Sequence, residues 1–127
     1  MRFFSEPGLR SFVGQHALDN DASCVAALDL VRALGCKVAA VTRGAKGCFW
    51  LDDAGTHLQP AFEVKVVDTT GAGDAFHGAY AVAMAEGSTV PDAMRRASAV
   101  AALKCTRQGG RAGIPDRTRL EAFLRQQ

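Results

Sequence analysis

The sequence predicts an α/β fold, and three observations support this class. Short apolar runs typical of strands alternate with longer stretches in which apolar residues recur at helical spacing. Glycine, aspartate or asparagine stands at most junctions between them, where turns and helix caps need these residues. The 127 residues are 48% hydrophobic, which is enough to bury a core, so one layered α/β domain is expected.

A helix comes first in this order. Asn20 or Asp21 is expected to cap it, because a side-chain oxygen at that position accepts a hydrogen bond from the first helical turn. Apolar residues recur at helical spacing as far as Leu34, and Gly35 is placed to end the helix.

Strands are expected to follow. Residues 38–42 read as a buried strand, and residues 48–51 and 56–59 flank an Asp-Asp-Ala-Gly turn that indicates a hairpin. Residues 62–66 alternate between apolar and charged side chains and predict a half-exposed strand. The predicted sheet therefore leads directly into the glycine-rich turn that comes next.

Helices are expected in the remainder of the chain. One runs from about residue 72 to 86 and is stopped by Gly87, and the next begins at Pro91, which suits a first helical turn, and ends near residue 105. A last amphipathic helix begins near Asp116. Its apolar side is formed by Leu120, Phe123 and Leu124.

Composition and charge exclude several classes of function. The net charge is +2 and no run of Lys or Arg exceeds two residues, so nucleic acid is not an expected partner, although Arg107 and Arg111 lie close together in a glycine-rich turn. No 18-residue apolar span and no signal-like amino terminus is present, so a cytoplasmic protein without membrane contact is expected.

Cysteine and histidine spacing does not indicate a zinc site. The four cysteines are expected to be reduced and mostly buried, and the three histidines lack ligand spacing. These residues are Cys24, Cys36, Cys48, Cys105, His16, His57 and His77.

The glycine-rich turn after residue 67 reads as a phosphate site with a base beside it. Gly71 and Gly73 allow a tight turn and close approach of backbone N–H groups to an anion, and the helix that begins there adds its positive end. Asp74 either caps this helix or takes a proton from an attacking hydroxyl. No P-loop motif is present, and Gly78 comes too late for a dinucleotide fingerprint, which leaves a Rossmann dehydrogenase as a distant alternative.

The string Asp-Thr-Thr-Gly-Ala-Gly-Asp-Ala-Phe at residues 68–76 resembles the signature of the ribokinase-like (PfkB) carbohydrate kinases. The resemblance implies the C-terminal part of a ribokinase-like three-layer α/β/α sandwich. It covers nearly all of residues 1–127, but only part of the family's fold. A single partial domain is therefore expected on the nucleotide-binding side, without the N-terminal sugar-binding and lid portion.

The resemblance also implies a mechanism. The γ-phosphoryl group of ATP is transferred in line to a sugar hydroxyl, with Asp74 as the base. The N–H groups of the turn at Gly71, Ala72, Gly73 and Asp74 hold the developing charge. Mg²⁺ accompanies the nucleotide.

A second turn, Thr-Arg-Gly-Ala-Lys-Gly at residues 42–47, is by itself an ordinary solvated connection. It is similar to the Thr-x-Gly-x-x-Gly loop that lies along the nucleotide phosphates in the resembled family. Thr42, Gly44 and Gly47 are therefore expected to contact nucleotide, while Lys46 either screens phosphate charge or stays in water.

The alanine-rich helix near residue 98 and the turn after it carry further expectations from the resemblance. Ser98 takes the place of a residue beside the adenine. Asp68, the Thr70 carbonyl and the backbone near Gly109 match the site of a monovalent cation, K⁺, found in many members.

One departure concerns residues 5–9, Ser-Glu-Pro-Gly-Leu, where many relatives have Asn-x-x-Glu, a motif that organises the magnesium water shell. Ser5 replaces the Asn and Gly8 replaces the Glu, and Glu6 is the candidate substitute. Mg²⁺ would then be held mainly by nucleotide phosphates and water.

The identity of the sugar is not readable from the chain. Residues 76–80 and 108–115 favour a bacterial kinase of the fructose or sulfofructose type, and His77 faces either the substrate or a neighbouring helix. Two alternatives stay open: a truncated, catalytically inactive nucleotide-binding fragment, and a remnant that oligomerises, for example as a homodimer, through surface left exposed.

Overall fold

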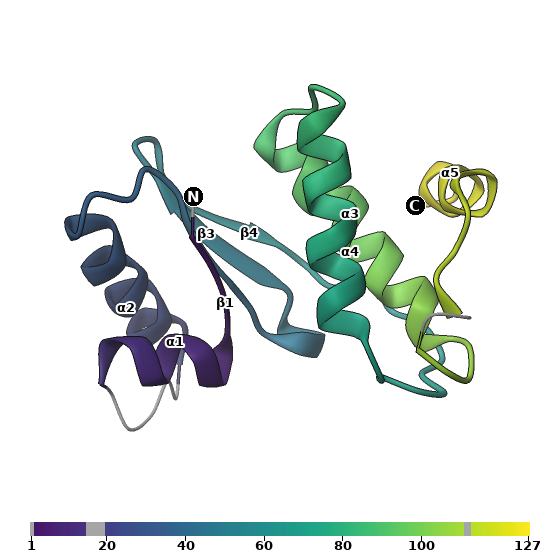
Figure 1. Cartoon of the computed structure of the whole chain (residues 1–127), viewed down its shortest axis with the longest axis horizontal. Coiled ribbons are helices and arrows are strands. Elements are labelled where there is room, and N and C mark those ends of the chain that lie inside the picture. The colour runs from purple at the N-terminus through teal and green to yellow at the C-terminus, as the bar shows by residue number, and fades with distance from the viewer. Residues whose placement is uncertain (1, 15–19, 111–112) are drawn as a thin grey trace. The chain divides into compact units, whose positions relative to one another are not determined.

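The computed structural model describes residues 2–14, 20–110 and 113–127 (Figure 1). The chain forms two compact units, Met1–Pro60 and Ala61–Gln127. The first combines a sheet with two helices and the second is built from helices. The predicted mixed α/β class is confirmed.

A four-stranded sheet in the order β1-β2-β3-β4 is the centre of the first unit. Its strands are β1 (Arg2–Ser5), β2 (Ala39–Thr42), β3 (Cys48–Asp52) and β4 (Gly55–Gln59). β1 and β2 are parallel, with Ser5 opposite Thr42, whereas β2–β3 and β3–β4 are antiparallel. The predicted hairpin is therefore confirmed, and the chain leaves β1 after Ser5 and β2 after Thr42 at the same edge of the sheet.

Helices α1 (Glu6–Val13) and α2 (Asp21–Ala33) pack against this sheet. Asn20 caps α2 as predicted, in a capping box with Ser23, and Gly35 follows its end with φ 101°. The core joins apolar side chains of both helices to those of the inner strands. Its fully buried members include Leu9, Cys24, Leu28, Val41 and Ala39.

Strand β1 and helix α1 were not predicted. The apolar run of β1 is short, and α1 has only eight residues and contains Gly8. The helix nevertheless begins at a regular cap, because the Ser5 hydroxyl accepts a hydrogen bond of 3.1 Å from Gly8 N, and Pro7 lies in the first turn.

The second unit contains α3 (Ala72–Ala85), α4 (Val90–Cys105) and α5 (Arg117–Arg125), as predicted (Figure 1). α3 and α4 pack closely along each other, and α5 covers part of α4. Thr89 and Asp116 cap α4 and α5 through their side chains. The core of this unit includes Ala75, Ala99, Val100, Leu103, Leu120 and Leu124.

The strand predicted at residues 62–66 is wrong. Side chains alternate in exposure over residues 62–65, but the segment has no neighbouring strand within the described residues, so no ladder forms. Its end is instead attached to α4, since Val67 N and Asp68 N both donate to Cys105 O, at 2.7 and 3.1 Å. The sheet therefore ends at Gln59, and a segment without regular secondary structure leads from there to the glycine-rich turn.

Candidate functional site

Asp68 organises the turn that precedes α3. Its Oδ1 accepts a hydrogen bond of 2.9 Å from Thr70 N, and its Oδ2 accepts one of 2.8 Å from Gly109 N. Hydrogen bonding by the Thr70 side chain, followed by the Thr70 and Gly109 backbones, lowers the pKa of this carboxyl to about 2. The structure thus brings together Asp68, Thr70 and Gly109, the three residues predicted to surround a cation.

Gly71 forms the corner between this turn and α3. Its backbone is left-handed, with φ 74°, a conformation that residues with a Cβ adopt only at a cost. The Gly71 carbonyl accepts the first hydrogen bond of α3, from Ala75 N at 2.9 Å. A Cβ on Gly71 would lie 3.7 Å from Gly110 Cα, which is ordinary van der Waals contact, so the requirement for glycine here comes from the left-handed backbone.

The N-terminus of α3 presents an open backbone face. Ala72 N donates to Thr69 O at 3.1 Å, so this amide is used within the turn. The amides of Gly73 and Asp74, by contrast, belong to the first helical turn and have no acceptor among the described residues. A Cβ on Gly73 would meet no atom within 4 Å, so the surface beside these amides is free to receive a ligand.

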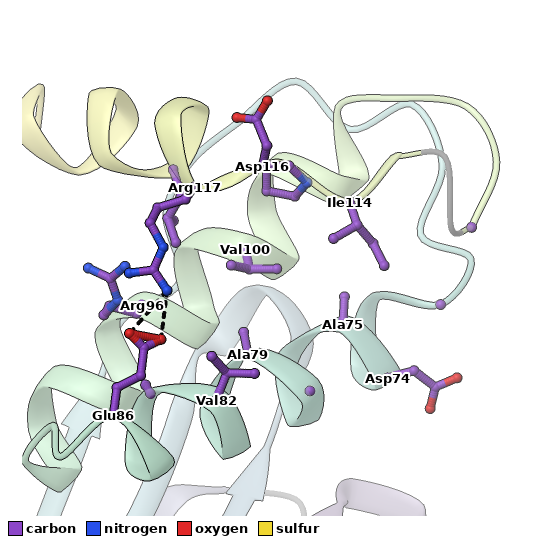
Figure 2. A pocket seen from close by; sticks show the side chains of 16 residues that line it. Asp74, Ala75, Ala79, Val82, Glu86, Arg96, Val100, Ile114, Asp116 and Arg117 are labelled. Carbon is purple, nitrogen blue, oxygen red and sulfur yellow. Dashed lines mark hydrogen bonds and ion pairs between the residues drawn. The ribbon is translucent and has the colours of Figure 1, made fainter.

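A cavity of about 650 Å³ extends from this turn along α3 and α4. Figure 2 shows Asp74 at one end, its carboxylate directed away from the apolar walls, and the Glu86–Arg117 ion pair at the other. The walls are mostly apolar, with Ala75, Ala79 and Val100 among them. Asp74 itself is exposed, so its carboxylate is accessible to a ligand at the helix terminus.

The predicted nucleotide loop lies in the other unit, between β2 and β3. Gly44 and Gly47 have φ values of 55° and 91°, and Arg43 N donates to Gly47 O at 2.8 Å, so the backbone turns back tightly on itself. Thr42 is half-buried and its hydroxyl donates to Phe4 O at 3.5 Å. Lys46 is exposed.

Arg43 fixes this loop and was missed by sequence reasoning. Its side chain is only 1% exposed, and it pairs with Glu6 Oε2 at 2.9 Å and Asp21 Oδ1 at 2.7 Å. The guanidinium also lies 5.1 Å from the ring centre of Phe49. Glu6, the candidate replacement in the magnesium motif, is therefore engaged with Arg43.

Ser98 is buried in α4, with 8% of its surface exposed, and among the described residues it does not line the 650 Å³ cavity. Its contact with a base stays a prediction. His77 is exposed on α3 and its ring packs edge-on against Phe76. His16 and Arg111 lie outside the described residues.

A second residue that sequence reasoning missed is Lys104, in the last turn of α4. It is 0% exposed, and its Nζ donates a hydrogen bond of 2.8 Å to the Asp68 carbonyl. The sequence contains a pattern that indicates the burial of Lys104. Lys104 continues the stripe of Ala93, Ala97 and Val100 at helical spacing, so a charged residue stands on the buried side of α4.

Among the described residues, no group of three or more His, Cys, Asp or Glu side chains is arranged to hold a metal ion. In the same residues, no helix combines the length and apolar character needed to span a bilayer. The four cysteines are free thiols, of which Cys24 and Cys48 are buried.

Comparisons with known proteins agree on one family. The family model of pfkB carbohydrate kinases matches residues 2–117. A ribokinase of Bacillus subtilis is 40% identical over 84 residues, which are 66% of this chain and 29% of that protein. The chain therefore spans less than a third of this relative's length.

Solved structures give the same result. A ribokinase of Arabidopsis thaliana in complex with ribose and ATP is 31% identical and superposes with a TM-score of 0.89, over 97% of this chain and 40% of that one. A fructokinase of Vibrio cholerae in a fructose-, ADP- and potassium-bound form is 27% identical, with a TM-score of 0.82 over 96% and 39%. The expected partial ribokinase-like fold is confirmed.

Proposed function

Because this chain belongs to the pfkB family of carbohydrate kinases, we propose that it carries the phosphate-binding and catalytic part of an ATP-dependent sugar kinase. The observation that supports this most directly is the N-terminus of α3. The unpaired amides of Gly73 and Asp74, the open surface at Gly73 and the exposed Asp74 carboxylate lie within one helical turn.

The proposed reaction uses this turn in two ways. The Asp74 carboxylate takes the proton of a sugar hydroxyl as its oxygen attacks the γ-phosphorus of ATP, and the bond from that phosphorus to the β-γ bridging oxygen breaks to release ADP. The amides of Gly73 and Asp74, with the positive end of the α3 dipole, stabilise negative charge on the transferred group. Gly71 and Ala72 shape the turn that positions these amides.

In each unit, considered by itself, we propose residues for nucleotide contact on the basis of the family resemblance. Thr42, Gly44 and Gly47 supply the loop that runs along the phosphates, and Ser98 stands on the side of the base. Mg²⁺ is proposed to arrive with the nucleotide, where it neutralises phosphate charge. We propose that a cation stabilises the part of the site formed by Asp68, Thr70 and Gly109. The Asp68 carboxylate joins these residues because it accepts hydrogen bonds from the backbone amides of Thr70 and Gly109.

The sugar is proposed to be a small carbohydrate of the fructose or sulfofructose type. Relatives include proteins named ribokinase and fructokinase, which supports the substrate class but not this choice within it. A cytoplasmic location belongs to the same proposal, and four free thiols are in keeping with it.

The test is Asp74→Asn in the whole protein that contains this chain, with ATP and a panel of sugars. We expect turnover to fall by about 10²- to 10⁴-fold, the usual contribution of a general base, while MgADP affinity stays unchanged. Equal turnover of variant and wild type would remove Asp74 from the role of base.

The same assay separates the alternatives. Turnover by the whole protein, combined with nucleotide binding but no turnover by the 127-residue chain, would identify the chain as a nucleotide-binding fragment. Self-association of the chain without nucleotide binding would favour the oligomerising remnant or homodimer. Light scattering on the same samples reports the oligomeric state.

A further inference from the structure

Lys104 is a buried cation that the proposed reaction does not use. It is 0% exposed in the last turn of α4, among the apolar residues of the second unit. Burying an ammonium group is costly unless acceptors and opposite charge compensate for the lost water. The ammonium group must therefore have a hydrogen-bond partner that offsets the free-energy cost of its burial.

That partner is the turn of Asp68. Lys104 Nζ donates to Asp68 O at 2.8 Å, and its charge also helps to keep the Asp68 carboxylate ionised. The same carboxylate accepts hydrogen bonds from Thr70 N and Gly109 N. The ammonium thus lies beside the residues that the resemblance assigned to a monovalent cation.

Gly113, in the segment after α4, packs closely against Lys104. A Cβ on the buried Gly113 would come within 3.1 Å of Lys104 O and 3.3 Å of Lys104 Cε, closer than ordinary packing allows. A side chain at residue 113 would therefore require Lys104 or its backbone to shift by a few tenths of an ångström. Lys104 O also accepts a hydrogen bond from Arg107 N, at 3.1 Å.

The residues present do not fit a free monovalent metal ion at this place. The Asp68 carbonyl already accepts from an ammonium group, and both carboxylate oxygens of Asp68 already accept from backbone amides. A metal cation brought to the same turn would also be repelled by the positive charge of Lys104.

We propose that Lys104 is the built-in cation of this turn: its ammonium group, tethered to α4, orders the Asp68 turn in place of a potassium ion. Lys104 is therefore a positioning residue. It acts on the phosphate-binding turn through the Asp68 backbone and touches neither ATP nor the sugar. The Vibrio cholerae fructokinase structure is a potassium-bound form, and this chain is proposed to differ from it.

The first experiment measures thermal unfolding of the wild-type chain in KCl, NaCl and tetramethylammonium chloride at equal ionic strength, without nucleotide. We expect the same midpoint in all three salts. A potassium site filled at these concentrations would instead raise the midpoint in KCl alone by several degrees, because a ligand that binds the folded state stabilises it. That result would overturn the proposal.

The second experiment uses Lys104→Ala, which removes the ammonium and leaves room for a small cation. We expect the variant to unfold at a lower temperature than wild type. KCl or ammonium chloride should raise its unfolding midpoint part of the way back to the wild-type value, and tetramethylammonium chloride should not. The control is Lys65→Ala, an exposed lysine of the same unit, which should behave as wild type in every salt.

Equal destabilisation of Lys104→Ala in all salts would show an ordinary packing role and overturn the proposal. If Lys104→Ala does not fold, the wild-type unfolding midpoints in the three salts still test whether the chain has a potassium site. Neither experiment requires nucleotide, so failure of the kinase assignment and failure of this inference are distinguishable.

Discussion

Asp68 joins three parts of the second unit through one side chain and one carbonyl. Its carboxylate binds the amides of Thr70 and Gly109, and its carbonyl binds the Lys104 ammonium. These bonds hold the turn before α3 against the turn after α4. The position of the Gly73 and Asp74 amides therefore depends on Asp68, although Asp68 is not itself proposed to touch the reacting atoms.

The ionisation of Asp68 should make folding depend on pH. Its folded-state pKa of about 2 lies below the value of about 3.9 expected in an unfolded chain. The carboxylate therefore stabilises the fold above about pH 4, and this contribution is lost as the pH falls from about 4 to 2. Urea unfolding of wild type and Asp68→Asn between pH 6 and 2 measures it.

We expect the stability difference between wild type and Asp68→Asn to shrink as the pH falls through this window. The control is Asp29→Asn, an exposed carboxylate on α2, whose difference from wild type should stay nearly constant. A constant difference for Asp68→Asn as well would contradict the assigned hydrogen bonds.

Residue-scale prediction from the sequence rests on side-chain type, and the roles predicted for the site residues stay predictions. Asp68, Gly71 and Asp74 were identified because a carboxylate and glycines stand in one contiguous motif. The bond from Asp68 to Gly109 joins positions 41 residues apart through a backbone amide. Gly109 was therefore named from the family resemblance alone, because a backbone amide is not visible in residue type. The burial of Lys104 could have been predicted from its position on the apolar stripe of α4, but it was missed.

At the scale of elements, caps and glycine stops account for most correct boundaries. Asn20, Thr89 and Asp116 each accept from a first-turn amide, and Gly35 and Gly87 follow helix ends with positive φ. These signals are local, so the sequence contains them. The strand at residues 62–66 was wrong because a strand also needs a neighbour, and alternation alone does not supply one.

The cap of α2 gives an element-scale prediction. The Asn20 side chain accepts from Ser23 N at 2.8 Å, and Ser23 Oγ accepts from Asn20 N at 3.2 Å. Asn20→Ala should therefore lower the free energy of unfolding by about 1 kcal/mol, as for other N-caps. Urea unfolding measures the change. Asn20→Asp, which keeps the acceptor, should retain most of the stability, and an unchanged Asn20→Ala would show that the cap does not contribute.

At the scale of the whole molecule, each unit carries one loop that is proposed to contact nucleotide. The loop at residues 42–47 belongs to one, and the turn at residues 68–74 belongs to the other. Both loops were predicted from the sequence because each carries a glycine motif, and their contact with nucleotide stays a prediction. The expectation of a single partial domain stays a prediction, since two compact units describe how the chain packs and not whether the units fold together.

The central claim is that the N-terminus of α3 binds the nucleotide phosphates, and calorimetric titration of MgADP into the chain tests it most directly. The comparison is between Gly73→Val and Gly78→Val, which add the same side chain to one helix at two positions where a Cβ meets no atom within 4 Å. Circular dichroism checks that both variants fold.

We predict that wild type and Gly78→Val bind MgADP, and that Gly73→Val binds at least about tenfold more weakly, a loss of about 1.4 kcal/mol or more. The reason is that the new side chain covers the amides proposed to receive phosphate. Binding of MgADP by Gly73→Val with wild-type affinity, or no binding by a folded wild-type chain, would contradict the claim.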